Sequence, residues 1–333
     1  MNAKSENLNP DLQAKGKSAG QYKMTIITIA IIAVLFIILN VITGSRFLTG
    51  SNMLTVLTNS VVPAFVVLGF CFIFTMGITD LSVGAIMILA SNIGGILAVE
   101  VGLGYFGLFV GGIGTAVLLQ LLNMKLMLAS KIPPWILGIG MTMVYEAIAS
   151  IYNAYMIGQA TQVVSLETQC RELGQAPWNI IVLAAGLIIA YLIYNRTNIG
   201  FGLRAVGSNR EVTKMMGINV NKAILLAGLV GGIFLGLAAI INSSYSGRVM
   251  PTTGLNSIGN IFTPLAAFLL ASALQKAFNL TIGAIVAAFL ITALFNVLTL
   301  MGVPSGTMQR VVMGASVLIC GIISQRGFKG VVK

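Results

Sequence analysis

Two carboxylates, Asp80 and Glu146, are the side chains of this sequence best placed to act inside a membrane. Asp80 precedes an apolar run and is followed closely by Ser82, whereas Glu146 lies well inside another apolar run. A charged group at membrane depth is costly and usually faces a bundle interior or a water-filled cavity. We therefore take Asp80, Ser82 and Glu146 as candidates for a solute path. The simpler alternatives are a helix cap for Asp80 and a structural hydrogen-bond partner for Glu146.

The composition indicates the class of protein that positions these groups. The chain has 333 residues, of which 57% are hydrophobic and 8% are charged, whereas a soluble domain carries about a quarter charged residues. A polytopic membrane protein is therefore predicted. Because the chain has no histidine and few acids, His-based catalysis and His-ligated metals are excluded, and a membrane enzyme is disfavoured. The isolated Cys71, Cys170 and Cys320 predict neither a disulfide nor a metal site.

About ten runs of the sequence are apolar enough to cross a bilayer, since a helical span needs about 20 such residues. The predicted fold is therefore all-α, a polytopic bundle of transmembrane helices. One membrane domain at 24–325 is expected between polar cytoplasmic tails at 1–23 and 326–333, with the first run retained as a span. The spans are placed at residues 24–43, 53–76, 82–101, 104–124, 133–152, 178–195, 223–242, 258–275, 279–300 and 308–324.

The distribution of lysine and arginine orients these spans. With the N-terminus inside the cell, ten spans place 15 of the 19 basic residues on the cytoplasmic side, which is the bias of membrane proteins. Both termini are therefore predicted to be cytoplasmic. The net charge of +11 then requires no nucleic acid as a partner. The four basic residues left outside are Arg46, Arg171, Arg248 and Arg310.

The loop 196–222 is a polar, charge-rich interval between two spans, on the predicted cytoplasmic side. It predicts a short helix, with Asn209 as N-cap, Glu211 in the first turn, Lys214 near the last turn and Gly217 as a left-handed C-cap. A short capped helix on the surface between two spans suits docking to a partner. The alternative is an ordinary basic cytoplasmic loop.

Small residues and one repeated motif bear on how the helices pack. Residues 80–86, Asp-Leu-Ser-Val-Gly-Ala-Ile, recur at 279–285 as Asn-Leu-Thr-Ile-Gly-Ala-Ile. Internal repeats of this kind are common in transporters.

Glycines spaced four apart on a helix allow close helix contacts. Two such pairs are Gly107 with Gly111 and Gly232 with Gly236.

Polar side chains inside the spans either bond neighbouring helices or line a path for a hydroxylated solute, and the sequence leaves both open. They are Asn59, Asn92, Gln120, Asn123, Asn260 and Asn296. Asn260 and Asn296 are the candidates for the path. On the predicted outer face, Arg171 lies in the long segment 153–177 and Arg248 in another loop. These two arginines either meet an acidic partner surface or are solvated loop charges.

Four segments of the chain match, in order and spacing, a set of known motifs. Residues 77–84 resemble G-x-x-D-L-S-V-G, and residues 131–141 resemble an I-P-P-F-I-x-T-L-G segment. The strongest match is 197–220, which resembles T-x-x-G-x-x-x-x-A-x-G-x-N-x-x-A-A-x-x-x-G-I-N-V. Residues 302–314 resemble G-V-x-x-x-x-Q-x-x-x-x-G. From about residue 50 to 325, the chain thus resembles the permease subunits of bacterial ABC importers for ribose, galactose and related sugars.

The resemblance implies a multi-pass permease of the bacterial plasma membrane that works by alternating access and carries no cofactor. ATP and Mg²⁺ would be bound by a separate cytoplasmic ABC ATPase. An extracytoplasmic solute-binding protein, with Arg171 and Arg248 as docking candidates, and a second permease chain are also implied. The candidate residues of the ATPase-coupling loop are Arg204, Gly207, Asn209, Arg210, Glu211, Lys214, Gly217 and Asn219.

The chain departs from the family pattern around its eighth span. The family usually has an acidic pair before that span and a glycine-rich turn after it, but residues 254–260 hold no acid and residues 271–279 no glycine. This departure favours pairing with a different permease chain that keeps the turn. Two alternatives stay open: an ion-coupled secondary transporter that uses Asp80 and Glu146, and an ABC permease for nucleosides or branched-chain amino acids.

Overall fold

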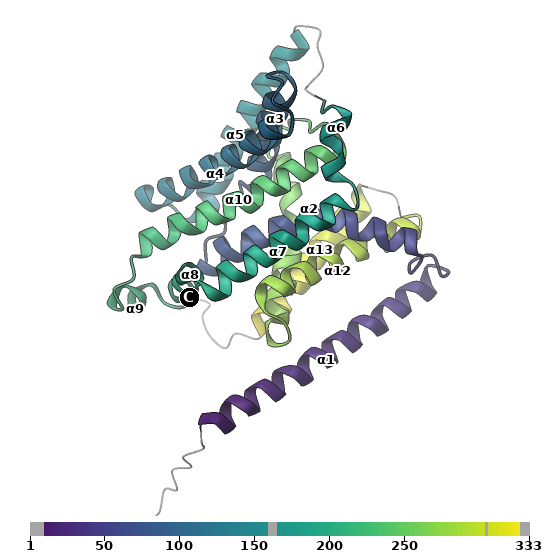
Figure 1. The fold of residues 1–333 in the computed structure, drawn as a ribbon, viewed down its shortest axis with the longest axis vertical. Helices are drawn as coiled ribbons and strands as arrows, with labels where there is room; N and C mark the ends of the chain where they lie inside the picture. The colour runs from purple at the N-terminus through teal and green to yellow at the C-terminus, as the bar shows by residue number, and fades with distance from the viewer. Residues whose placement is uncertain (1–9, 159–164, 304–305, 327–333) are drawn as a thin grey trace, which may run out of the picture.

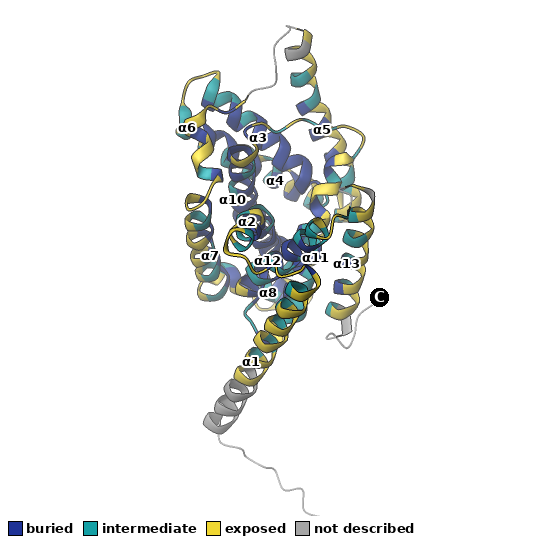
Figure 2. Cartoon of the chain, turned by 90° about the vertical axis from the view of Figure 1, so that its right-hand side faces the viewer, coloured by how far each residue is buried: buried dark blue, intermediate teal, exposed yellow. Residues whose placement is uncertain are grey.

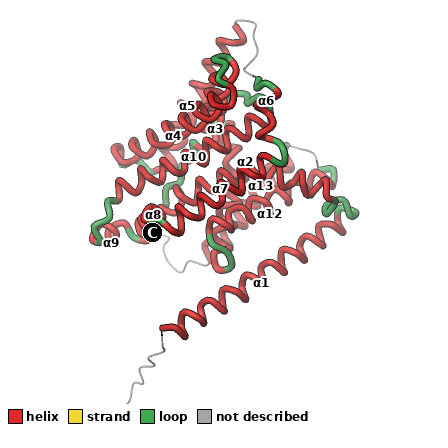
Figure 3. The backbone as a smooth tube through the Cα atoms, in the orientation of Figure 1, coloured by secondary structure: helices red, strands yellow, loops and turns green. Residues whose placement is uncertain are grey.

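The computed structural model describes residues 10–158, 165–303 and 306–326 of the chain. Every regular element among these residues is a helix, and short loops and turns connect the helices (Figure 1; Figure 3). The predicted all-α bundle is therefore confirmed. From residue 327 on, the predicted C-terminal tail lies outside the described residues.

The helices fall into three groups by length. The long ones are α1 (Pro10–Ile42), α2 (Gly50–Ile73), α3 (Val83–Val99), α4 (Gly104–Ser130), α5 (Pro134–Gly158), α7 (Trp178–Arg196), α10 (Val220–Ser246), α11 (Gly259–Ala273), α12 (Leu280–Leu300) and α13 (Thr307–Arg326). The shorter ones are α6 (Thr168–Arg171), α8 (Asn198–Ser208) and α9 (Arg210–Met215). Single 3₁₀ turns are η1 (Phe74–Met76), η2 (Glu172–Gly174), η3 (Asn256–Ile258) and η4 (Leu274–Lys276).

The observed helices coincide with the ten predicted spans. Eight are long and apolar enough to cross a membrane, while α3 and the apolar part of α13, Met308–Ser324, are shorter apolar helices. Two predicted boundaries need correction. Helix α1 begins at Pro10, so part of the predicted N-terminal tail is helical. The loop 196–222 holds two helices, α8 and α9, where one was predicted.

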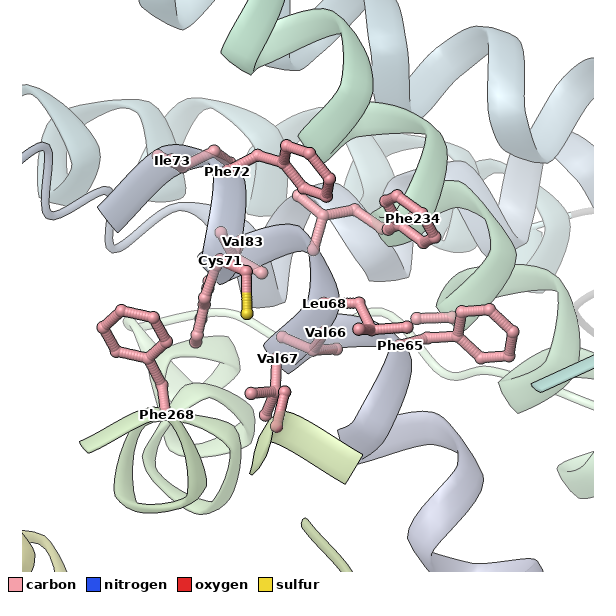
Figure 4. Close-up of a cluster of buried hydrophobic side chains, with 14 of the residues drawn as sticks. Phe65, Val66, Val67, Leu68, Cys71, Phe72, Ile73, Val83, Phe234 and Phe268 are labelled. Carbon is pink, nitrogen blue, oxygen red and sulfur yellow. The ribbon is translucent and has the colours of Figure 1, made fainter. Parts of the chain in front are cut away.

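Helices α2 and α10 form the centre of the bundle. The most apolar stretch of each is 72% buried, whereas that of α1 is 0% buried, and Figure 2 shows this gradient from the dark centre to the yellow outer helix. Aromatic rings pack between these helices: Phe72 of α2 stacks on Phe234 of α10, with ring centroids 5.6 Å apart (Figure 4). Phe70 of α2 meets Phe268 of α11 edge-on. The three cysteines are free and buried.

Glycine-mediated contacts of α4 with α3 and α10 are confirmed. A Cβ atom added at Gly111 would lie 2.8 Å from the Cα of Gly94 on α3. One added at Gly236 on α10 would lie 2.6 Å from the Cα of Ile113 on α4. Because real Cβ atoms need more room, these helices reach their observed distance only with glycine at the contact.

Several helix ends gather at one end of the bundle. The amides of Asn195, at the end of α7, and Asn279, at the start of α12, exchange hydrogen bonds of 3.2 and 2.7 Å. Helix α8 lies against η1, as the closeness of Gly207 to Thr75 shows. The predicted alternation of spans placed all these ends on one side, and the contacts agree. That this side is cytoplasmic, with both termini on it, stays a prediction.

Candidate docking surface and translocation path

Helix α8 is fixed against α7 and η1 by close backbone contacts. A Cβ atom at Gly207 would lie 1.9 Å from the carbonyl oxygen of Thr75, and one at Gly200 would lie 2.0 Å from that of Tyr194. Arg204 donates to the Tyr194 carbonyl, and its guanidinium carbon lies 5.1 Å from the centre of the Tyr194 ring. Helix α8 is therefore packed directly on α7 and on η1, the turn that follows α2.

The predicted short helix is confirmed as α9, together with its caps. Asn209 Oδ1 accepts hydrogen bonds from the N–H groups of Glu211 and Val212, at 3.0 and 3.1 Å. Lys214 Nζ lies 3.0 Å from Glu211 Oε1, and both side chains are exposed. Gly217 has a φ of +77°, the left-handed conformation expected at a C-cap. These local bonds hold α9 as a defined turn of helix at the end of the bundle.

Both ends of α9 are tied to the membrane helices. Arg210 donates to the carbonyl oxygen of Met76 in η1 at 3.4 Å. On the other side, Asn219 Oδ1 accepts from the N–H of Lys222 at 3.0 Å and so caps α10. The eight coupling-loop candidates therefore lie on one connected structure that joins η1, α7 and α10.

The exposed face of α9 carries apolar side chains that the sequence reasoning missed. Val212, Met215 and Met216 are 51%, 85% and 61% exposed. Only Thr213 of this helix is buried. Flexible methionines on an exposed helix are typical of adaptable protein contacts. In the sequence, this apolar face is indicated only by the adjacent Met215 and Met216 in an otherwise polar loop. We name Glu211, Val212, Lys214, Met215 and Met216 the α9 knob.

A buried polar cluster surrounds Asp80, which is 2% exposed. Its Oδ1 accepts from the N–H and the hydroxyl of Ser82, at 2.9 and 2.7 Å. Its Oδ2 accepts from Gln120 Nε2 and Asn123 Nδ2, at 2.9 and 3.0 Å. The Tyr145 hydroxyl of α5 donates to Asn123 Oδ1 at 2.7 Å. The Asp80 carboxylate thus connects the start of α3 directly to α4, and Asn123 extends the cluster to Tyr145 on α5.

This cluster differs from the helix cap that was the simpler alternative for Asp80, and the candidacy of Asp80 and Ser82 for the solute path stays a prediction. Helix α3 starts with Ser82 as its N-cap residue, without a capping side-chain bond. Asp80 instead fixes the buried irregular backbone before α3, where unpaired polar groups would be costly. The repeated motif behaves similarly: Asn279 Oδ1 accepts from the N–H and hydroxyl of Thr281, at 3.3 and 3.1 Å. The two copies of the sequence repeat therefore make the same local hydrogen bonds, from the N–H and the hydroxyl of the residue two positions later.

Glu146 is a buried structural partner of the segment that leads into α11. It is 3% exposed, and its Oε2 and Oε1 accept from the N–H groups of Leu255 and Ser257, at 2.9 and 2.8 Å. Leu255 has a φ of +66°, a conformation unusual for a side chain of this size. Glu146 thus holds a strained turn in place. Its candidacy for the solute path stays a prediction.

The Glu146→Gln variant is expected to destabilise the folded protein by about 1–3 kcal/mol, since a glutamine offers one acceptor oxygen where two buried N–H groups need one each. Thermal unfolding in detergent measures the change. Glu100→Gln is the matched control, because Glu100 is exposed and accepts from one hydroxyl, that of Tyr152. Equal unfolding midpoints for the two variants would contradict the structural role.

Two adjoining cavities lie beside α11. The outer cavity, about 540 Å³, lies between α11 and α13 and includes Asn256, Asn260 and Arg310 in its wall. The inner cavity, about 280 Å³, lies between α2, α3, α10 and α11. Asn260 lines both. Asn296 lines neither of the two, and its amide exchanges hydrogen bonds of 2.9 and 3.0 Å with Asn52; its candidacy for the path stays a prediction.

The two outer arginine candidates lie on neighbouring segments. Arg171 Nε lies 3.0 Å from the position that a Cβ atom of Gly247 would take, and Gly247 directly precedes Arg248. The N–H of Leu166 donates to the Gly247 carbonyl at 2.8 Å, which ties these segments together. Both arginines are exposed. The two predicted loops therefore form one surface, at the end of α10 away from α8 and α9 (Figure 1).

Residues 52–321 match the family described as branched-chain amino acid transport system / permease component. This chain belongs to that permease family. It is accordingly a multi-pass membrane protein of the transport class, and the match covers both the cavities and the α8–α9 structure.

Three sugar permeases are similar in sequence to this chain. The fructose import permease protein of Rhizobium meliloti is 25% identical over 236 residues, which are 68% of this chain and 66% of that protein. The ribose import permease protein of Escherichia coli (strain K12) is 26% identical over 308 residues, 89% of this chain and 93% of that protein. The D-allose transport system permease protein of the same strain is 23% identical over 233 residues, 68% of this chain and 70% of that protein. No solved structure matches this permease.

Proposed function

We propose that this chain is the permease subunit of an ATP-driven ABC importer for a small sugar in the bacterial inner membrane. ATP and Mg²⁺ bind a separate cytoplasmic ATPase, and the ATPase docks on the α9 knob. Closing and opening of the ATPase move α8, and α8 moves the membrane helices between outward- and inward-facing states. No step of this cycle requires covalent chemistry on the permease.

The α9 knob is the observation that carries the proposal. A helix of six residues is too short to be stable alone. Here it is held by the Asn209 cap and by Arg210, and it presents exposed methionines. The close packing of α8 against η1 at Gly207 connects α9 to α2. The names of the sugar permeases that the chain matches support the solute class.

Two further partners complete the proposed complex. A solute-binding protein docks on the outer surface that carries Arg171 and Arg248, where acidic side chains of the partner would meet the two guanidinium groups. A second permease chain lies beside this one in the bilayer. Because the η4 turn lacks the glycines usual in the family, we propose that this second chain is a different one that keeps them. Native complexes that contain only this permease would contradict the heterodimer.

ATP-dependent uptake into membrane vesicles tests the function. Right-side-out vesicles that hold the complete complex are loaded with ATP and offered radiolabelled D-ribose, D-fructose, D-xylose or D-allose, with leucine and uridine as comparisons. We expect uptake of one sugar that requires internal ATP and persists when ionophores dissipate ion gradients. Uptake that follows an ion gradient would favour a secondary transporter, and ATP-driven uptake of leucine or uridine alone would overturn the sugar assignment.

A further inference from the structure

The inner cavity contains asparagine side chains whose hydrogen-bonding groups are not used by the protein. Within the described residues, the amides of Asn242 and Asn260 hydrogen-bond to no protein group, and both side chains are at least partly exposed. Some other amides of the bundle pair with each other, as Asn52 does with Asn296, and the unpaired Nδ2 of Asn92 is buried away from the cavity lining. A paired amide binds a solute only after its own bonds break, whereas Asn242 and Asn260 offer donors and acceptors directly.

Neighbouring groups on α11 add to this open polar surface. Pro264 has no N–H, so the carbonyl of Asn260 lacks the donor that a regular helix would supply four residues later. Pro63 of α2 also lines the inner cavity. The Thr263 hydroxyl donates at 3.4 Å to the thioether sulfur of Met313, which lines the outer cavity. Because sulfur is a weak acceptor, a solute hydroxyl replaces it at small cost.

The charge and shape of the inner cavity restrict the solute. Among the residues that the structure describes, no charged side chain lines it, and Arg310 lines the outer cavity instead. Val62, Met87 and Ile88 provide apolar walls opposite the amides. A monosaccharide matches this arrangement, since its hydroxyls need amide and hydroxyl partners while its C–H faces pack on apolar side chains. An ionised amino acid would leave two charges without partners there.

We propose that the inner cavity is a sugar-binding subsite on the translocation path, in which Asn242, Asn260 and Thr263 hydrogen-bond the hydroxyls of a neutral monosaccharide. This inference rests on the proposed function. The solute enters from the outer cavity past Asn260, the side chain common to both cavities. Displacement of the Thr263 hydroxyl from Met313 opens the connection between them.

Sugar uptake by variants of the complete complex tests the subsite, with rates expressed per folded permease. Asn242→Ala and Asn260→Ala are each expected to lower the maximal rate about 3- to 10-fold, because each removes a hydrogen-bonding partner of the solute. Asn260→Ser, which keeps a short polar group, is expected to restore part of the rate. The ratio of rates for two accepted sugars is expected to change as well, which a purely structural defect would not produce.

Asn52→Ala is the matched control, because it removes a membrane asparagine that pairs with a protein side chain away from both cavities. Its uptake rate per folded permease is expected to stay within about twofold of the parent. If the parent complex imports a sugar and the Asn242 and Asn260 variants match it in rate and sugar ratio, the subsite is wrong and the function stands. If the parent complex imports no sugar with ATP, the proposed function fails and the subsite with it.

Discussion

Replacing Asp80 with leucine is expected to abolish the accumulation of folded permease. The substitution removes the acceptor of Ser82, Gln120 and Asn123 in a site that is 2% exposed. Each buried donor left without a partner costs about 1–3 kcal/mol. Asp80 accepts from four donor groups, since Ser82 donates through both its N–H and its hydroxyl, and the loss of all four bonds approaches the whole stability of a typical folded protein, about 5–15 kcal/mol. Size-exclusion chromatography and thermal unfolding in detergent measure the result.

A second variant at position 80 separates the charge from the hydrogen bonding, and a variant elsewhere in the chain serves as the control. Asp80→Asn keeps the shape and one acceptor oxygen, so an intermediate loss of stability is expected. Glu172→Leu is the control, because Glu172 is exposed at the start of η2 and should tolerate the change. An Asp80→Leu protein that is monodisperse and melts at the parent temperature would show that the cluster does not hold α3, α4 and α5 together.

Reversing the charge of Glu211 or deforming the end of α9 at Gly217 is expected to uncouple transport from ATP. Glu211→Arg places a cation on the docking face, and Gly217→Val forces a β-branched residue into a φ of +77°. ATP-dependent sugar uptake should fall about tenfold or more for each variant, since Glu211→Arg alters the docking face itself and Gly217→Val displaces it. Uptake in membrane vesicles measures the loss, and immunoblotting measures the amount of inserted permease.

The exposed ion pair in α9 provides a matched control for folding. An exposed pair such as Lys214–Glu211 contributes only about 0–1 kcal/mol, so its loss should leave the permease inserted. The double exchange Glu211→Lys with Lys214→Glu restores an ion pair within α9 but alters the surface offered to the ATPase. We expect this double variant to stay uncoupled. Parental uptake in the double variant would assign the effect to helix stability rather than docking.

The sequence predicted the features that depend on residues close together in the chain. The α9 caps at Asn209 and Gly217 follow from local conformational preferences, and the spans follow from runs of apolar residues. The contact faces of α4 and α10 follow from glycine spacing. Each of these signals is contained within one or two helical turns, so no knowledge of the tertiary structure was needed.

The sequence did not predict the contacts between distant segments. Asp80 meets Gln120 and Asn123 only because α3 and α4 pack side by side, and nothing in the local pattern distinguishes such a cluster from a cap. The same holds for Asn296, which pairs with Asn52 although it was expected on the path. The unused amide of Asn260 could be recognised only after its surroundings were known.

The most direct test of docking through the α9 knob is purification of the tagged chain from its own membranes in a mild detergent, with identification of the proteins that come with it. We expect an ATPase with a phosphate-binding loop, which is retained by the parent and lost from the Glu211→Arg variant. A different permease chain is predicted in the same complex. A stable chain that purifies alone, or an ATPase retained equally by the variant, would contradict docking through the α9 knob.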